Sequence, residues 1–119
     1  MLDVTPLQTA VDALADRLRS LPQSRLDQGA AAEALALARQ LATRAQLIER
    51  PGEPPYELPD AGMFEVGDQL AVAGHDLVEA LRAAAVRMAG KTVDSDANVA
   101  PADELAGAVR DVRAVAERW

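Results

Sequence analysis

A proline-rich segment places the strongest constraint on what this chain can fold into. Four prolines fall within "RPGEPPYELPDAG", residues 50–62. Proline lacks a backbone N–H and clashes with the preceding helical turn, so no regular helix can cross this segment. Loops of this length are often functional or mobile. The favoured interpretation is a strap across the end of a bundle, with Tyr56 and Leu58 packed on the core. The alternative is a small-ligand pocket near Tyr56, Met63 and Phe64.

Both sides of this segment show apolar residues at helical spacing. In the first stretch Leu7, Val11, Leu14 and Leu18 recur at intervals of four and three residues, with charged residues between them. No alternating pattern typical of a strand is present. The sequence therefore predicts an all-α, antiparallel four-helix bundle in one domain, residues 1–119, with the proline-rich loop between its second and third helices. The expected helices span residues 5–21, 27–49, 61–90 and 101–119.

Composition excludes several classes of function. Half of the chain is hydrophobic but only 3% is aromatic, which predicts a thin core of Ala, Leu and Val. A formal net charge of -7 argues against binding to nucleic acid or to anionic membranes, both of which attract basic proteins. Cysteine is absent, so disulfides and thiolate metal sites are excluded. We expect a cytoplasmic protein without a signal peptide and without a cofactor.

The third predicted helix carries a seam of small residues beside a stripe of bulky ones. Glycine inside a helix costs about 1 kcal/mol relative to alanine, so two glycines in register indicate close backbone approach. The alanine edge of the second helix is the expected partner. The wide apolar arc predicts neighbours on two sides, either two helices of one bundle or one helix and a symmetry mate. The predicted packing or association seam consists of Gly67, Ala71, Gly74, Val78 and Ala85.

The opposite face of this helix holds the only histidine, His75, and several acids. Glu79, one turn on, is the expected surface partner of His75. Two acid pairs, Glu65 with Asp68 and Asp76 with Glu79, have the spacing that can hold Mg²⁺. They resemble the acid pairs of all-helical nucleotide pyrophosphatases, which implies a Mg²⁺- or Mn²⁺-dependent hydrolase. Both pairs lie on one helix about 16 Å apart, however, so a solvated acidic face is the favoured interpretation.

The segment "DSDAN", Asp94 to Asn98, has the opening ligand spacing of a calcium-binding EF-hand loop. Val99 stands where that loop needs glycine, and Leu105 stands where it needs glutamate. We therefore expect a polar loop that leads into the fourth helix.

The segment "ELPDAGMFEVGDQLAVAGHDL" and the Ala-, Arg- and Asp-rich composition are similar to small helical actinobacterial proteins of unknown function. That resemblance implies no activity. The leading hypothesis is a non-enzymatic bundle that acts through protein–protein association, as a homodimer or as an accessory or regulatory subunit. The alternatives are the metal-dependent hydrolase and the small-ligand-binding bundle.

Overall fold

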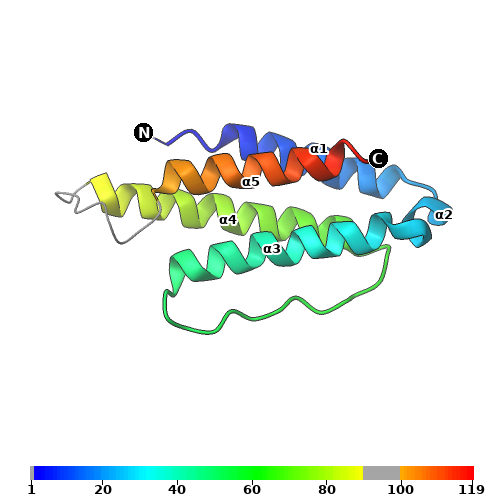
Figure 1. Ribbon diagram of the computed structural model, residues 1–119, viewed down its shortest axis with the longest axis horizontal. Coiled ribbons are helices and arrows are strands. Elements are labelled where there is room, and N and C mark those ends of the chain that lie inside the picture. The colour runs from blue at the N-terminus through cyan, green and yellow to red at the C-terminus, as the bar shows by residue number, and fades with distance from the viewer. Residues whose placement is uncertain (1, 90–99) are drawn as a thin grey trace.

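The computed structural model describes residues 2–89 and 100–119, which form helices and connecting segments without a strand. This confirms the predicted all-α, four-helix fold, and the proline-rich loop lies between the second and third long helices (Figure 1). Two short elements, α2 and the π-helical segment η1, lead into the second long helix. The elements are α1 (Thr5–Ser20), α2 (Gln23–Arg25), η1 (Leu26–Ala30), α3 (Ala31–Glu49), α4 (Val66–Ala89) and α5 (Pro101–Ala116).

The helices run in two parallel pairs. α1 and α5 begin at the same end of the molecule, whereas α3 and α4 begin at the other end (Figure 1). The sequence predicted antiparallel neighbours, and α3 and α4 differ from that expectation. The reason is the length of their connection, residues 50–65, which runs back along α3 before α4 begins. A short connection would have forced the two helices to be antiparallel.

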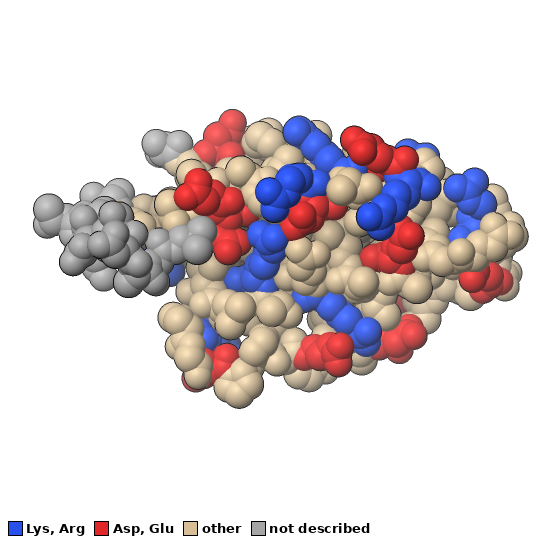
Figure 2. All heavy atoms as spheres, viewed as in Figure 1, with Lys and Arg blue, Asp and Glu red and all other residues tan. Residues whose placement is uncertain are grey.

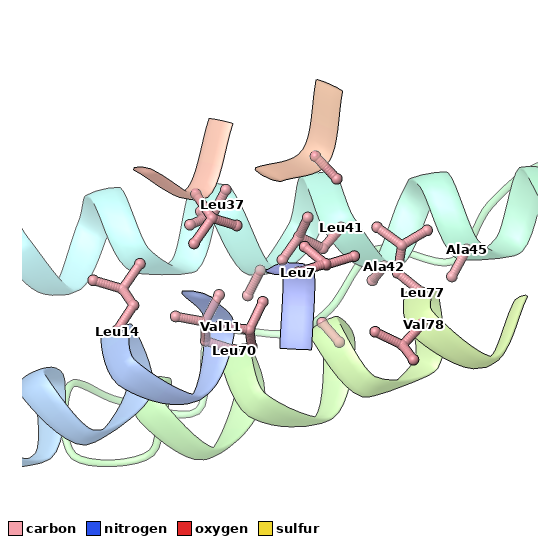
Figure 3. Close-up of a cluster of buried hydrophobic side chains, with 14 of the residues drawn as sticks. Leu7, Val11, Leu14, Leu37, Leu41, Ala42, Ala45, Leu70, Leu77 and Val78 are labelled. Carbon is pink, nitrogen blue, oxygen red and sulfur yellow. The ribbon is translucent and has the colours of Figure 1, made fainter. Parts of the chain in front are cut away.

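The core is aliphatic throughout and lies between the four long helices (Figure 3). The predicted stripe of α1 is buried, and Leu41 and Leu77 meet it from α3 and α4. No polar or charged residue is buried within residues 2–89 and 100–119. The fold therefore depends on Leu, Val and Ala packing, which stabilises by roughly 25 cal/mol per Å² of apolar surface removed from water.

Several of the predicted helix boundaries differ from those in the structure. α4 begins at Val66 rather than residue 61, because Gly62 adopts φ 99° and its N–H bonds to Asp60 Oδ1 at 2.9 Å, which makes a turn. The helical stretch before α3 begins at Gln23 and is kinked at Gly29, where φ is 125°. α5 ends at residue 116 rather than 119.

The predicted end of the third helix at residue 90 and the calcium-loop candidate at residues 94–98 lie outside the described residues. Within the described residues, no helix combines the length and the apolar character that crossing a membrane requires.

Candidate functional site

The predicted glycine seam is the contact between α4 and α1. A Cβ placed on Gly74 would overlap the Val11 side chain, lying 2.8 Å from its Cγ2 and 3.0 Å from its Cβ. A Cβ on Gly67 would lie 3.3 Å from the carbonyl oxygen of Ala15. The glycines therefore allow close approach, as their spacing predicted, but the partner is α1 rather than the alanine edge of α3. α4 has two main neighbours, α3 running parallel to it and α1 running antiparallel, and the glycine face meets α1.

The other seam residues differ in exposure. Val78 is buried, whereas Ala71 and Ala85 are half-buried. The tightest part of the seam, Gly67, Gly74 and Val78, is thus filled by the chain's own core.

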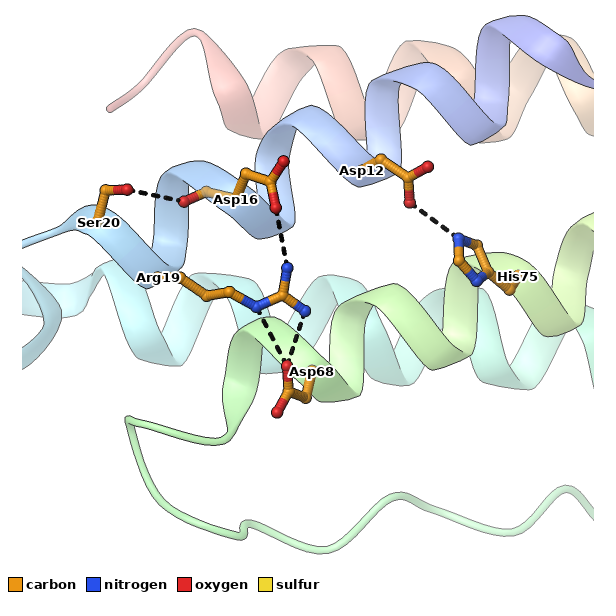
Figure 4. A network of polar contacts seen from close by, with 6 residues as sticks. All are labelled: Asp12, Asp16, Arg19, Ser20, Asp68 and His75. Atoms are coloured by element: carbon orange, nitrogen blue, oxygen red, sulfur yellow. Dashed lines mark hydrogen bonds and ion pairs between the residues drawn. The ribbon is translucent and has the colours of Figure 1, made fainter.

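Polar side chains line the open edge of the same α1–α4 contact (Figure 4). His75 Nε2 lies 2.8 Å from Asp12 Oδ1 on α1. The sequence predicted that His75 pairs with Glu79 and lies on a different surface from the glycines. Instead both Gly74 and His75 face α1, and Glu79 accepts a hydrogen bond from Arg82 at 2.9 Å. Asp12 is the one hydrogen-bond partner of the His75 ring among the residues the structure describes.

A second cross-helix contact lies nearby on this edge. Arg19 donates from Nη2 to Asp68 Oδ1 at 2.7 Å and from Nη1 to Asp16 Oδ1 at 3.0 Å (Figure 4). The hydrogen bond to Asp68 raises the pKa of Arg19 above its usual value. Because all these groups are exposed, solvent screens these ion pairs and they add little to stability. They orient α1 against α4 without forming a reactive centre.

The four acids of the hydrolase alternative are not gathered into one site. Asp68 is bound by Arg19, and Glu79 is bound by Arg82. Glu65 and Asp76 are exposed. Across residues 2–89 and 100–119, no group of three or more His, Cys, Asp or Glu side chains could hold a metal ion.

The proline-rich strap lies along α3 rather than across the end of the bundle (Figure 1). Gln46 holds it by a pair of hydrogen bonds: its Oε1 accepts from the Tyr56 N–H at 2.6 Å, and its Nε2 donates to the Tyr56 carbonyl at 2.9 Å. Arg39 Nε donates to the Leu58 carbonyl at 2.8 Å. Backbone N–H and C=O groups of the extended strap are thus hydrogen-bonded by side chains of α3, the helix beneath it.

The strap side chains do not enclose the predicted pocket. Tyr56 is 67% exposed and Phe64 is 71% exposed, whereas Leu58 and Met63 are half-buried. A shallow hollow between strap and α3 includes Tyr56, but neither Met63 nor Phe64 lines it. The expected packing of Leu58 is confirmed, and that of the Tyr56 side chain is wrong because its backbone, not its ring, is anchored.

Gln46→Ala is expected to release the strap locally. Each net hydrogen bond contributes about 1 kcal/mol, so loss of both should raise the hydrogen-exchange rate of the Tyr56 amide by about ten-fold or more. The amides of α1 should be unaffected, which native-state exchange measured by NMR would show. Gln28→Ala is the matched control, because Gln28 is exposed and makes no side-chain hydrogen bond among the described residues. Unchanged exchange at Tyr56 would contradict this role of Gln46.

A partly buried ion-pair cluster joins α3 to α5, and it was not predicted from the sequence. Arg44 donates to Glu104 Oε2 at 2.9 Å and to Asp111 Oδ2 at 2.6 Å, and Gln40 donates to the same Asp111 oxygen at 2.7 Å. The three charged side chains are only 22–29% exposed. Gly107 leaves room for the guanidinium, because a Cβ there would lie 3.3 Å from Arg44 Nη1.

A shallow groove runs between α1 and α5 on the outer surface. It consists of two adjoining hollows that share Pro6 and Arg113, and we call it the α1/α5 groove. Its walls are mainly apolar, and buried Leu14, Leu105 and Val112 lie at its base. The remaining lining residues are Asp3, Thr5, Thr9, Ala10, Ala13, Arg17, Ala102, Ala106, Val109, Arg110, Ala114, Ala116 and Glu117.

Charged residues of the groove lie mainly towards its ends, except that Arg110 lies nearer the middle and Glu117 lines the end that also holds Arg113. Asp3 is at the amino-terminal end, where hydrogen bonds from the Thr5 side chain and backbone lower its pKa below the usual value. Arg17 and Arg113 line the same hollow near the other end, and no ion-pair partner for either is found in the described part of the chain. Over the face seen in Figure 2, acidic and basic side chains are otherwise intermingled.

Comparison with protein-family models, with curated proteins and with solved structures finds no match for this chain.

Proposed function

We propose that this protein is a non-catalytic module that works by binding protein through the α1/α5 groove. The carrying observation is the groove itself: a continuous apolar surface between two parallel helices, flanked by arginines that lack partners within the described residues. A groove between two helices is a common receptor for a third amphipathic helix or for another helical pair.

The remainder of the described surface supports this choice. The glycine seam, which the sequence offered as the association face, is occupied by α1. Other exposed large apolar side chains, such as Tyr56 and Phe64 on the strap and Val86 on α4, lie on separate elements. Singly exposed apolar residues are common on monomeric proteins, whereas contiguous apolar patches mark interaction sites.

Ala106→Arg tests the proposal, because Ala106 is exposed and lines the groove. An arginine there should block an incoming helix and leave the melting temperature within about 2 °C, since the residue touches solvent. We expect the tagged wild-type chain, used as bait in the cells that make it, to retain a protein that the variant does not retain. An untagged second copy of this chain would count as such a retained protein.

The matched control is Ala83→Arg, an exposed alanine on the outward face of α4. It should retain what the wild type retains. Identical capture by wild type and Ala106→Arg, or capture of no protein at all, would contradict binding through this groove.

A further inference from the structure

The occupant of the α1/α5 groove can be inferred from the order of charges along it. α1 and α5 run in the same direction (Figure 1), and Pro6 lines one hollow with Ala102 while Leu14 lines the other with Val112. On α1, Asp3 begins the groove and Arg17 ends it. Along α1 the groove is therefore acidic at one end and basic at the other, with mainly small side chains between.

α5 repeats this order. Asp103 is exposed in the first turn, and Arg113 lies in the last turn. Arg110, nearer the middle, is held by the adjacent Asp111, with Nε 3.6 Å from Oδ1. Glu117 follows the end of the helix at residue 116. Glu117 lines the groove, whereas Asp103 lies outside its lining. Up to the end of the helix, α5 still carries an acid in its first turn and a base in its last turn, as Asp3 and Arg17 mark the two ends of α1.

We propose that a second copy of this chain docks on the α1/α5 groove, antiparallel and related by a two-fold axis near Ala10. This rests on the proposed function and names the partner. The two-fold axis lies in the interface and perpendicular to the helices, so α1 faces the partner's α1 and α5 faces the partner's α5. A contact of this kind uses the same patch on both copies and closes after two subunits.

Sequence spacing sets the register. Ala10 lies midway between Asp3 and Arg17, so centring the axis there brings each Asp3 against Arg17 of the other copy. The same operation brings Asp103 towards Arg113 of the other copy. The unpartnered arginines of each groove then meet carboxylates, and opposite charges across an interface favour the correct register.

The parallel alternative is disfavoured by the same charges. If the axis ran along the helices, α1 would face the partner's α5 in the same direction. Arg17 would then approach Arg113 of the other copy, and Asp3 would approach Asp103. Juxtaposed like charges cost free energy, so the charge order selects the antiparallel arrangement.

Small side chains near the axis allow the copies to approach closely. Ala10 lies on the axis, with Pro6 and Ala13 to either side of it. Two sixteen-residue helices present a face about 24 Å long and about 20 Å wide. That area is at the low end for specific association, so the dimer should be reversible, with a dissociation constant of about 10 µM.

Sedimentation velocity over a concentration series tests this arrangement with a charge swap. Arg17→Glu should weaken dimerisation by about ten-fold or more, because two symmetric pairs are lost in each dimer. Asp3→Arg should do the same. The double variant Asp3→Arg/Arg17→Glu restores opposite charges in the same register and should return to within about three-fold of the wild type. Arg87→Glu, on the exposed face of α4, is the matched control and should have no effect.

Asp3 also bonds the first turn of α1, so circular dichroism should confirm that its variants remain folded. If one does not, Asp103→Arg with Arg113→Glu provides a second swap. A wild type that stays monomeric up to about 500 µM would overturn the second copy as partner. The antiparallel register would be overturned if Arg17→Glu left the dissociation constant of the dimer unchanged, or if the double variant dimerised no more tightly than the single variants. In both of these cases the proposed function would still be supported if the wild type captured some other protein and the Ala106→Arg variant did not.

Discussion

Gly74→Leu is expected to destabilise the protein by about 3 kcal/mol or more, the largest effect of any single substitution predicted for it. Even the first added atom, a Cβ, would overlap the Val11 side chain, and Val11 is itself fully buried. Leucine adds three further carbons at the tightest point of the α1–α4 contact. The gain in helix propensity over glycine is about 1 kcal/mol and cannot offset this overlap.

Urea denaturation followed by circular dichroism would measure the change in the free energy of unfolding. Gly74→Ala alone should destabilise, but Val11→Ala removes both of the methyl groups that the new Cβ meets. The double variant Val11→Ala/Gly74→Ala should therefore be more stable than the sum of its single changes predicts, by about 1 kcal/mol or more.

Gly67 provides the matched control at the same interface. Its added Cβ would lie 3.2 Å from Cγ of Arg19, a flexible and exposed side chain that can move aside, and 3.3 Å from the carbonyl oxygen of Ala15, a contact that a shift of a few tenths of an ångström relieves. Gly67→Ala should thus change stability by less than about 1 kcal/mol. If Gly74→Leu were tolerated as well as Gly67→Ala, the close approach of α1 and α4 would be wrong.

The predictable part of this fold is the part encoded at short range. The apolar stripe of α1 follows from spacings of three and four residues, and the buried set Leu7, Val11, Leu14 and Leu18 confirms it. Pro101 at the first turn of α5 likewise marks a real helix start. Periodicity and end signals act within one or two turns, so one sequence is enough to reveal them.

Which helix packs against a given helical face depends on contacts between residues that are far apart in the sequence. The residue spacing of α4 identified its glycine face correctly, but the predicted packing partner of that face was α3 rather than α1. The assignment depended on whether the strap crosses the end of the bundle or runs its length. That course is decided by contacts such as Gln46 with the Tyr56 backbone, which no periodic pattern reveals.

The candidate sites show the same division. The spacing of Gly67 and Gly74 revealed a close contact in advance, whereas the α1/α5 groove required the helices to be placed side by side. The role of Arg44 was not predicted, because its partners come from α5, 60 and 67 positions away in the sequence. One local signal existed: Glu104, Gly107 and Asp111 share a face of α5, with the glycine opening a gap between two acids.

Arg44→Met is the second substitution expected to have a large effect, about 2 kcal/mol of destabilisation at neutral pH. Methionine keeps most of the aliphatic stem but removes the charge that Glu104 and Asp111 share. Removing one member of a fully buried ion pair costs 3–5 kcal/mol in other proteins, and the partial exposure of this cluster reduces that cost to about 2 kcal/mol. Asp111 keeps its bond from Gln40, so Glu104 bears most of the loss.

Urea denaturation would again provide the measurement, with Arg19→Met as the matched control. Arg19 also bonds two carboxylates, but all three groups are exposed, so its loss should lower stability far less than the loss of Arg44. Adding Glu104→Gln to Arg44→Met removes the stranded charge and should recover about half of the lost stability.

The two arginines should also respond differently to salt. Raising the ionic strength screens exposed pairs more than partly buried ones, so the destabilisation by Arg19→Met should fade while that by Arg44→Met persists. Because the Arg44 cluster joins α5 to α3, its loss should raise hydrogen exchange in α5 more than in α1 or α4. Equal costs for the two arginines, or uniform exchange across the bundle, would mean that this cluster does not anchor α5.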